Sequence, residues 1–122
     1  MNSFNRSDRL GNQLHREIGN VIHFEITDPR LQFVTVTEVR LARNLKDATV
    51  FIAVMGDDRD EVFARLVHAG TFIRKRTAER CSIKFMPRLN FKLDLSRERG
   101  AKIDNLLNQV KNDLEEDSSE SE

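Results

Sequence analysis

Tryptophan and tyrosine are absent from this 122-residue chain, and cysteine occurs once, proline twice and glycine five times. The single cysteine, Cys81, excludes an internal disulfide and fits a protein that works in a reducing cytosol. No stretch approaches the roughly 18 consecutive apolar residues of a membrane span, and the N-terminal residues lack the apolar run of a secretory signal. These absences predict a cytoplasmic protein without a membrane contact.

The small number of glycines and aromatic residues also makes two modes of ligand binding unexpected. No glycine-rich loop follows a strand pattern, so a nucleotide-binding α/β fold is not expected. The eight phenylalanines are the chain's whole supply of large aromatic rings, and they fit core positions. Stacking of unpaired bases on aromatic rings is therefore not the expected mode of nucleic-acid binding.

Charge is balanced overall but unevenly placed. The chain has 20 basic and 20 acidic residues, and six of the acidic residues lie in the last ten positions. Residues 1–112 consequently carry a positive surplus, whereas residues 112–122 have Leu114 as their one apolar residue and are expected to be a disordered tail. A basic body with an acidic tail is typical of a polyanion binder, although the tail alone also fits a solvated end that aids solubility.

Hydrophobic periodicity predicts the first helix over residues 6–26, ended by Pro29. Its apolar face comprises Leu10, Leu14, Ile18, Val21 and Ile22. Two strands follow over residues 33–41 and 48–55, joined by a short polar link that predicts a hairpin. The second strand is more uniformly apolar, as expected of a strand covered on both faces. The first alternates, and the residues expected on one face are Phe33, Thr35, Thr37, Val39 and Leu41.

The second half of the chain is helical again from Arg59 to Cys81. Gly70 interrupts this segment and predicts a kink or a break. A third strand is predicted over residues 83–93, where Pro87 marks a bulge, a sheet edge or the true start of the strand. A closing helix is predicted over residues 98–114.

This order of elements predicts an α+β domain in which helices, including the C-terminal one, pack on one three-stranded sheet. Residues 1–111 are assigned to this domain and residues 112–122 to the tail.

Candidates for catalysis are poor. His15, His23 and His68 are not paired for a metal, and each fits a packing or surface role. Cys81 ends an apolar helical face and fits the core. The acidic run at residues 57–61 lacks the spacing of a calcium loop and fits a helix start. The sequence therefore predicts no catalytic residue, no metal and no cofactor.

The basic residues are more informative. Several follow the glycine break, others line the first helix, and others lie at the hairpin turn, where they can neutralise phosphates. A helix that begins at a glycine break adds backbone amides for a phosphate. The alternative is an ordinary solvated helix face. The candidate RNA-binding residues are Arg6, Arg9, Arg16, Arg43, Lys46, Gly70, Arg74, Lys75, Arg76, Arg80, Lys84 and Arg88.

An ordered set of short stretches resembles the ribosome-binding factor A family over residues 5–111. The stretches are Arg9-x-x-x-Gln13-x-x-Arg16-Glu17-Ile18, Glu25-Ile26-Thr27-Asp28-Pro29-Arg30-Leu31, Val34-Thr35-Val36-Thr37-Glu38-Val39, Leu45-Lys46-Asp47-Ala48-Thr49-Val50, Phe72-Ile73-Arg74, Pro87-Arg88-Leu89-x-Phe91 and Asp94-x-Ser96-x-x-x-Gly100. Each stretch is a weak signal alone, but their unbroken order is specific.

The resemblance implies a type II KH-like fold in the order helix, strand, strand, helix, kink, helix, strand. It also implies a monomer that binds the small (30S) ribosomal subunit during late maturation of 16S rRNA, near the rRNA 3′ end and decoding region. Precursor processing and cold adaptation belong to the same expectation. The family has a kink of the form Ala-x-Gly; here Ala69 matches, Gly70 stands in the middle and Thr71 replaces the glycine.

Two other functions remain as alternatives to RNA binding. A protein-interaction module would use the same basic face for an acidic protein partner. A small nuclease or RNA modifier would need a constellation of carboxylates or histidines that the sequence does not offer.

Overall fold

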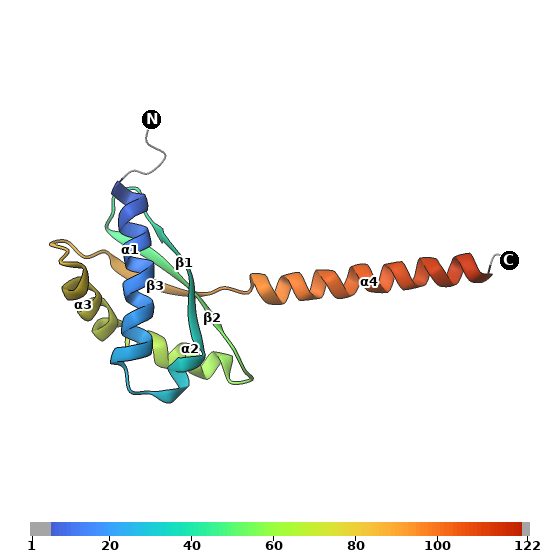
Figure 1. The fold of residues 1–122 in the computed structure, drawn as a ribbon, viewed down its shortest axis with the longest axis horizontal. Coiled ribbons are helices and arrows are strands. Elements are labelled where there is room, and N and C mark those ends of the chain that lie inside the picture. Colours follow the sequence, from blue (N-terminus) through green and yellow to red (C-terminus); the bar gives the residue numbers. More distant parts are fainter. Residues whose placement is uncertain (1–5, 121–122) are drawn as a thin grey trace.

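The computed structural model describes the backbone of residues 6–120 and the side chains of residues 8–114. Its main elements confirm the α+β class (Figure 1). They are α1 (Arg6–Asn20), the π-helical turn η1 (Val21–Glu25), the short 3-10 helix η2 (Pro29–Phe33), β1 (Val34–Leu41), β2 (Asp47–Val54), α2 (Arg59–His68), α3 (Gly70–Cys81), β3 (Arg88–Leu93) and α4 (Ser96–Glu120).

The sheet has the order β1-β2-β3, with β1 antiparallel and β3 parallel to β2. The hairpin predicted between the first two strands is confirmed. Because a parallel neighbour requires a crossover connection, the chain passes through α2 and α3 before it returns as β3.

The core lies between this sheet and the helices α1, α2 and α3. Its fully buried members include Leu14, Ile18, Val50, Ile52, Leu66 and Ile73.

The predicted apolar face of the first helix is confirmed from Leu14 to Ile22. Leu10 packs against the same core and is partly buried. Burial of each large aliphatic side chain contributes about 1.5–3 kcal/mol. The stripe therefore fixes α1 on the sheet.

The inward face of β1 differs from the prediction because the strand contains a β-bulge. The pairing with β2 shifts between Val36 and Glu38, which leaves Thr37 as the extra residue. A bulge reverses the alternation of side chains, so the residues that face the core are Val34, Val36, Val39 and Leu41. The first three residues of the predicted face are exposed instead: Phe33, Thr35 and Thr37.

Only one face of β2 is buried. Its buried residues alternate with half-exposed ones and are Ala48, Val50 and Ile52. The prediction of a strand covered on both faces is therefore wrong. Phe51 lies on the open face, with the guanidinium carbon of Arg40 at 5.2 Å from the centre of its ring.

The third strand begins later than predicted, at Arg88. Two of the three meanings considered for Pro87 hold, since it directly precedes the start of β3 and β3 is an edge strand. Pro87 is buried, and the N–H of Arg88 makes the first ladder hydrogen bond, to the carbonyl oxygen of Lys46 at 2.9 Å. Residues 82–87 are a loop, so their side chains do not follow strand alternation.

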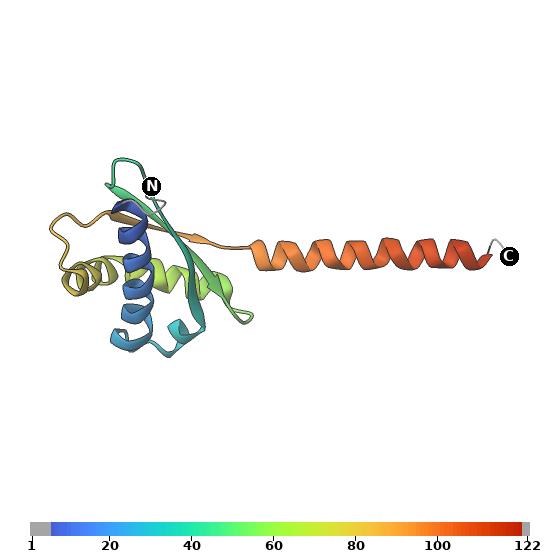
Figure 2. The same ribbon diagram turned by 45° about the horizontal axis from the view of Figure 1, so that its top comes forward.

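The helix α4 projects away from the rest of the molecule (Figures 1 and 2). Its apolar side chains are 55–62% exposed and are Ile103, Leu106, Leu107, Val110 and Leu114. The predicted packing of the C-terminal helix on the sheet is therefore wrong. The backbone of residues 112–120 continues α4, so the predicted boundary at residue 111 has no counterpart in the backbone. The division of the chain into residues 1–111 and 112–122 stays a prediction.

Asp94 ties the start of α4 to the sheet. Its carboxylate accepts hydrogen bonds from the hydroxyl and backbone N–H of Ser96, at 2.6 and 3.0 Å, and from the Thr37 hydroxyl at 2.6 Å. These bonds, led by the one from the Ser96 hydroxyl, lower the pKa of Asp94 to about 2. The carboxylate is thus ionised at neutral pH and holds the junction between β3 and α4.

Two histidines bond to the outer edge of β1. Nε2 of His15 lies 2.7 Å from the carbonyl oxygen of Val36, and Nε2 of His23 lies 2.6 Å from that of Val34. A carbonyl oxygen can only accept, so both rings donate from Nε2. These bonds give His15 and His23 a structural role between the first helical segment and the sheet.

Candidate nucleic-acid interface

The predicted break between the two middle helices lies at Ala69. α2 ends at His68 and α3 begins at Gly70, with Ala69 at φ −82° and ψ 2° between them. Gly70 does not have a positive φ, so its backbone conformation does not require glycine. What matters at this position is the absence of a side chain. A Cβ atom at Gly70 would lie 3.4 Å from Cε2 of Phe91. The missing side chain therefore lets the start of α3 approach β3 closely.

A groove of about 510 Å³ lies between the start of α3 and β3. We call it the α3–β3 groove. Its lining is mainly apolar and includes two arginines. The residues that line it include Gly70, Thr71, Arg74, Arg88, Leu89 and Phe91. An unpaired nucleotide has an apolar base face next to a charged phosphate, so this composition suits single-stranded nucleic acid.

The strand side of the groove is an open sheet edge. Among residues 6–120, β3 has a neighbouring strand on one side only. The N–H groups of Arg88 and Asp94 both donate toward β2, at 2.9 and 2.7 Å. Backbone groups alternate along a strand, so Leu89 and Phe91 direct their N–H and C=O groups to the other side. Such unpaired backbone donors and acceptors can bond to the polar edge of a base.

Arg74 lines the α3–β3 groove and also anchors the loop that follows α3. Its Nε donates to the carbonyl oxygen of Pro87 at 3.0 Å, and its Nη2 donates to that of Met86 at 2.6 Å. Carbonyl oxygens carry no net charge, so these bonds fix the guanidinium group without cancelling its charge. Arg74 thus presents a positioned cation in the lining of the groove.

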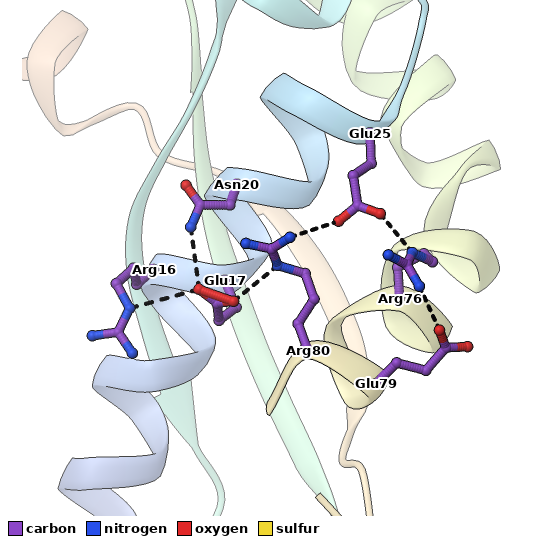
Figure 3. Close-up of polar contacts among 7 residues, drawn as sticks. All are labelled: Arg16, Glu17, Asn20, Glu25, Arg76, Glu79 and Arg80. Atoms are coloured by element: carbon purple, nitrogen blue, oxygen red, sulfur yellow. Dashed lines mark hydrogen bonds and ion pairs between the residues drawn. The ribbon is translucent and has the colours of Figure 1, made fainter. Parts of the chain in front are cut away.

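Arg76 and Arg80 have a different environment, because both are paired with carboxylates (Figure 3). Arg80 bonds to Glu17 at 2.9 Å and to Glu25 at 3.1 Å, and Arg76 bonds to Glu25 at 2.5 Å. The network also includes the ion pairs Arg76–Glu79 and Arg16–Glu17. We call it the α1–α3 ion-pair network. Its three arginines and three glutamates balance, so it adds little net charge to the surface.

The α1–α3 ion-pair network is partly shielded from water. The side chains of Glu17 and Glu25 are 13% and 19% exposed. The hydrogen bond from Arg80 lowers the pKa of Glu17, and the bonds to glutamate raise the pKa of both Arg76 and Arg80. Glu17, Arg76 and Arg80 are therefore charged at neutral pH, and the network joins α3 to α1 and η1.

Other predicted cations gather where β1 and β2 are joined. Arg43 and Lys46 lie in the turn of residues 42–46, and Arg88 is bonded to this turn through its backbone. The first turns of α1, with Arg9, lie beside the end of β1 (Figure 1). We call Arg9, Arg43, Lys46 and Arg88 the cationic end.

Three members of the cationic end have no side-chain partner within the described part of the chain. Among the residues whose side chains are described, those of Arg9, Arg43 and Lys46 have no hydrogen bond or ion pair, and Arg88 pairs with Asp47 at 3.0 Å. On α3, Lys75 is exposed and equally unpaired within the described side chains. The side chain of Arg6, also predicted, lies outside that part of the chain.

Of the seven phenylalanines whose side chains the structure describes, four are exposed, so the prediction that the phenylalanines fill the core is wrong for these four. The exposed ones are Phe24, Phe33, Phe72 and Phe85. Phe85 lies in the loop that precedes β3, and the ammonium group of Lys84 lies 5.5 Å from the centre of its ring. The sequence placed Phe85 inside a strand, where alternation suggested an inward side chain. That signal failed because the strand starts at Arg88.

Two findings bear on the residues considered for catalysis. Cys81 is buried, and burial raises the pKa of its thiol, so it is a weak nucleophile at neutral pH. Within the described part of the chain, no three His, Cys, Asp or Glu side chains are grouped so that they could hold a metal ion. No helix of that part is long and apolar enough to cross a membrane.

The three-stranded sheet, the helix break and the groove beside an open strand define an α+β domain of the KH-like class. The chain belongs to the ribosome-binding factor A family, because the family model described by that name matches residues 6–107. It is 39% identical over 117 residues to ribosome-binding factor A of Halothermothrix orenii, covering 94% of this chain and 96% of that protein. It is 40% identical over 118 residues to the Desulfitobacterium hafniense protein of the same name, covering 95% and 94%.

Solved structures agree with this assignment. The crystal structure of ribosome-binding factor A from Thermus thermophilus superposes with a TM-score of 0.65 at 26% identity, covering 73% of this chain and 97% of that one. A homology model of the T. thermophilus protein, fitted into a cryo-EM map of a 30S–RbfA complex, gives a TM-score of 0.59 at 27% identity. It covers 70% of this chain and 91% of that one.

Proposed function

We propose that the protein binds the small (30S) ribosomal subunit and assists late maturation and processing of 16S rRNA, with a role in cold adaptation. Membership of the ribosome-binding factor A family carries this proposal, and the T. thermophilus model fitted into a 30S complex supports it. The protein acts in the cytoplasm as a monomer, without cofactor or catalysis, near the 3′ end and decoding region of the rRNA.

The α3–β3 groove and the cationic end are the proposed contact surface. A single-stranded segment of rRNA lies in the groove, with base edges bonded to the open edge of β3. Arg74 and Arg88 bind its phosphates, and Arg9, Arg43 and Lys46 bind phosphates of neighbouring rRNA. The protein holds or blocks one rRNA conformation, which requires binding energy but no bond-making chemistry.

Binding to purified 30S subunits is expected to weaken steeply as salt increases. Each neutralised phosphate contributes a log–log slope of about −0.7 to −0.9, so several contacts give a slope of roughly −3 or steeper. Pelleting of subunits across a salt series measures it. A flat salt response would count against phosphate-led binding. Sedimentation of lysate after ribonuclease treatment provides the control, since an acidic protein partner would keep the protein in heavy fractions.

The double substitution Arg76→Ala/Arg80→Ala is expected to lower the melting temperature, because it removes both arginine partners of Glu25 and the Arg80 bond of Glu17 in a partly shielded site. Affinity for 30S subunits should change by less than about threefold, since balanced ion pairs release few counterions. Circular dichroism and subunit pelleting measure the two effects below the melting transition.

Lys75→Ala is the matched control on the same helix, because Lys75 is exposed and unpaired among the described side chains. It should leave the melting temperature unchanged. A double variant that melts like the wild type but fails to bind would show that these arginines bind rRNA instead of holding α3.

A further inference from the structure

The loop of residues 82–87 holds an aromatic ring outside the protein surface. At its start, Ser82 has left-handed backbone angles, φ 52° and ψ 40°, which turn the chain out of α3. At its end, Arg74 bonds to the carbonyl oxygens of Met86 and Pro87. Both ends of the loop are therefore fixed, and the ring between them has a defined position.

Of the apolar residues in this loop, only Phe85 turns away from the core. Ile83 and Met86 pack against the core, and Pro87 is buried. The side chain of Phe85 is 80% exposed, so it gives up the stabilisation that burial of a phenyl ring normally provides. The ammonium group of Lys84 lies 5.5 Å from the ring centre, which orients the ring by a cation–π contact and leaves most of its surface open.

The position of the ring relates it to the α3–β3 groove. Arg74 lines that groove and anchors the loop, so the loop stands at the end of the groove where β3 begins. The flanking side chains on this side are cationic: Arg74, Lys84 and Arg88. An apolar protein partner would prefer a contiguous apolar patch, whereas one aromatic ring among cations suits one base beside its phosphates.

We infer that Phe85 is a stacking platform for one unpaired base of RNA, and that Lys84 binds a phosphate next to that base. The inference rests on the proposed function and adds a contact at the end of the α3–β3 groove. RNA that lies along β3 continues past the loop, and its next base stacks on the open side of the ring.

Substitutions of Phe85 test this with two probes, purified 30S subunits and a short single-stranded RNA that carries 2-aminopurine. Phe85→Ala is expected to weaken binding about tenfold, since stacking of one base contributes that order of affinity. Phe85→Leu keeps apolar bulk without a π face and should weaken binding as much, whereas Phe85→Trp should bind like the wild type. Quenching of 2-aminopurine on binding should be lost in the alanine and leucine variants.

The chain offers a matched control in Phe24, which is 81% exposed. It follows His23, whose ring bonds to Val34 at the start of β1, so it lies at the opposite end of the sheet from Arg88. Phe24→Ala should leave binding within about twofold of the wild type, as for surface substitutions elsewhere. Lys84→Gln should reduce the magnitude of the salt slope by about 0.7–0.9.

Three outcomes overturn the inference. The first is a Phe85→Ala variant that binds as well as Phe24→Ala. The second is full affinity in Phe85→Leu, which would indicate an apolar contact, and the third is quenching that persists without the ring. All three are measured against wild-type protein that binds 30S subunits. Failure of the wild type to bind would instead contradict the proposed function, so the two ideas are separable.

Discussion

Ile73→Ala is expected to lower the free energy of unfolding by about 2–5 kcal/mol, the range for removing a large aliphatic side chain from a packed core. Ile73 is fully buried and belongs to the cluster that joins α3 to α1 and the sheet. Loss of its side chain leaves a cavity there. Urea denaturation followed by circular dichroism measures the change.

Phe72→Ala provides the control for this substitution. Phe72 is the preceding residue of α3 and is 43% exposed, so it has the larger side chain but the weaker packing. Its loss should cost less than about 1.5 kcal/mol. A larger effect for Phe72 than for Ile73 would mean that α3 is rotated from the orientation described.

The double charge reversal Arg43→Glu/Lys46→Glu is expected to weaken binding to 30S subunits by roughly 100-fold at low salt, because the two proposed phosphate contacts become repulsive. Both residues are exposed in the turn between β1 and β2 and have no side-chain partner among the described residues. Thermal melting should therefore be unchanged. Equilibrium binding of a labelled protein to purified subunits measures the loss.

Lys102→Glu/Lys111→Glu makes the same change of charge on α4. Both lysines are exposed and lie on the helix that projects away from the cationic end (Figure 2). This pair should weaken binding much less than the pair in the turn. Equal losses would show that the total charge matters and that the cationic end has no special role.

Local patterns in the sequence predicted most of the fold. Periodicity reveals features that depend on residues close together in the sequence. These are the stripe from Leu14 to Ile22, the break near Gly70 and the hairpin. The bulge at Thr37 is not among them, because it is a property of how two strands pair. The place of α4 was also beyond periodicity, which identifies an apolar stripe but not the surface that the stripe meets.

The kinds of residue in the candidate site could be predicted from the sequence, but the contacts of their side chains could not. Arg76 and Arg80 share a helical face, which suggested phosphate binding, but their partners Glu17 and Glu25 lie 51–63 residues away in sequence. Only the tertiary fold brings these charges together. The exposure of Phe85 was missed for a similar reason, since it follows from the late start of β3 after Pro87.

The histidine bonds along β1 have a consequence for how copies of the protein can aggregate. A fibril of stacked strands grows only if each sheet offers two open edges. His15 and His23 occupy carbonyl oxygens on the outer edge of β1, which leaves β3 as the open edge of the three-stranded sheet. Pairing through β3 ends after two copies, because no second edge continues the ladder. The open edge of β3 is thereby kept from nucleating a fibre.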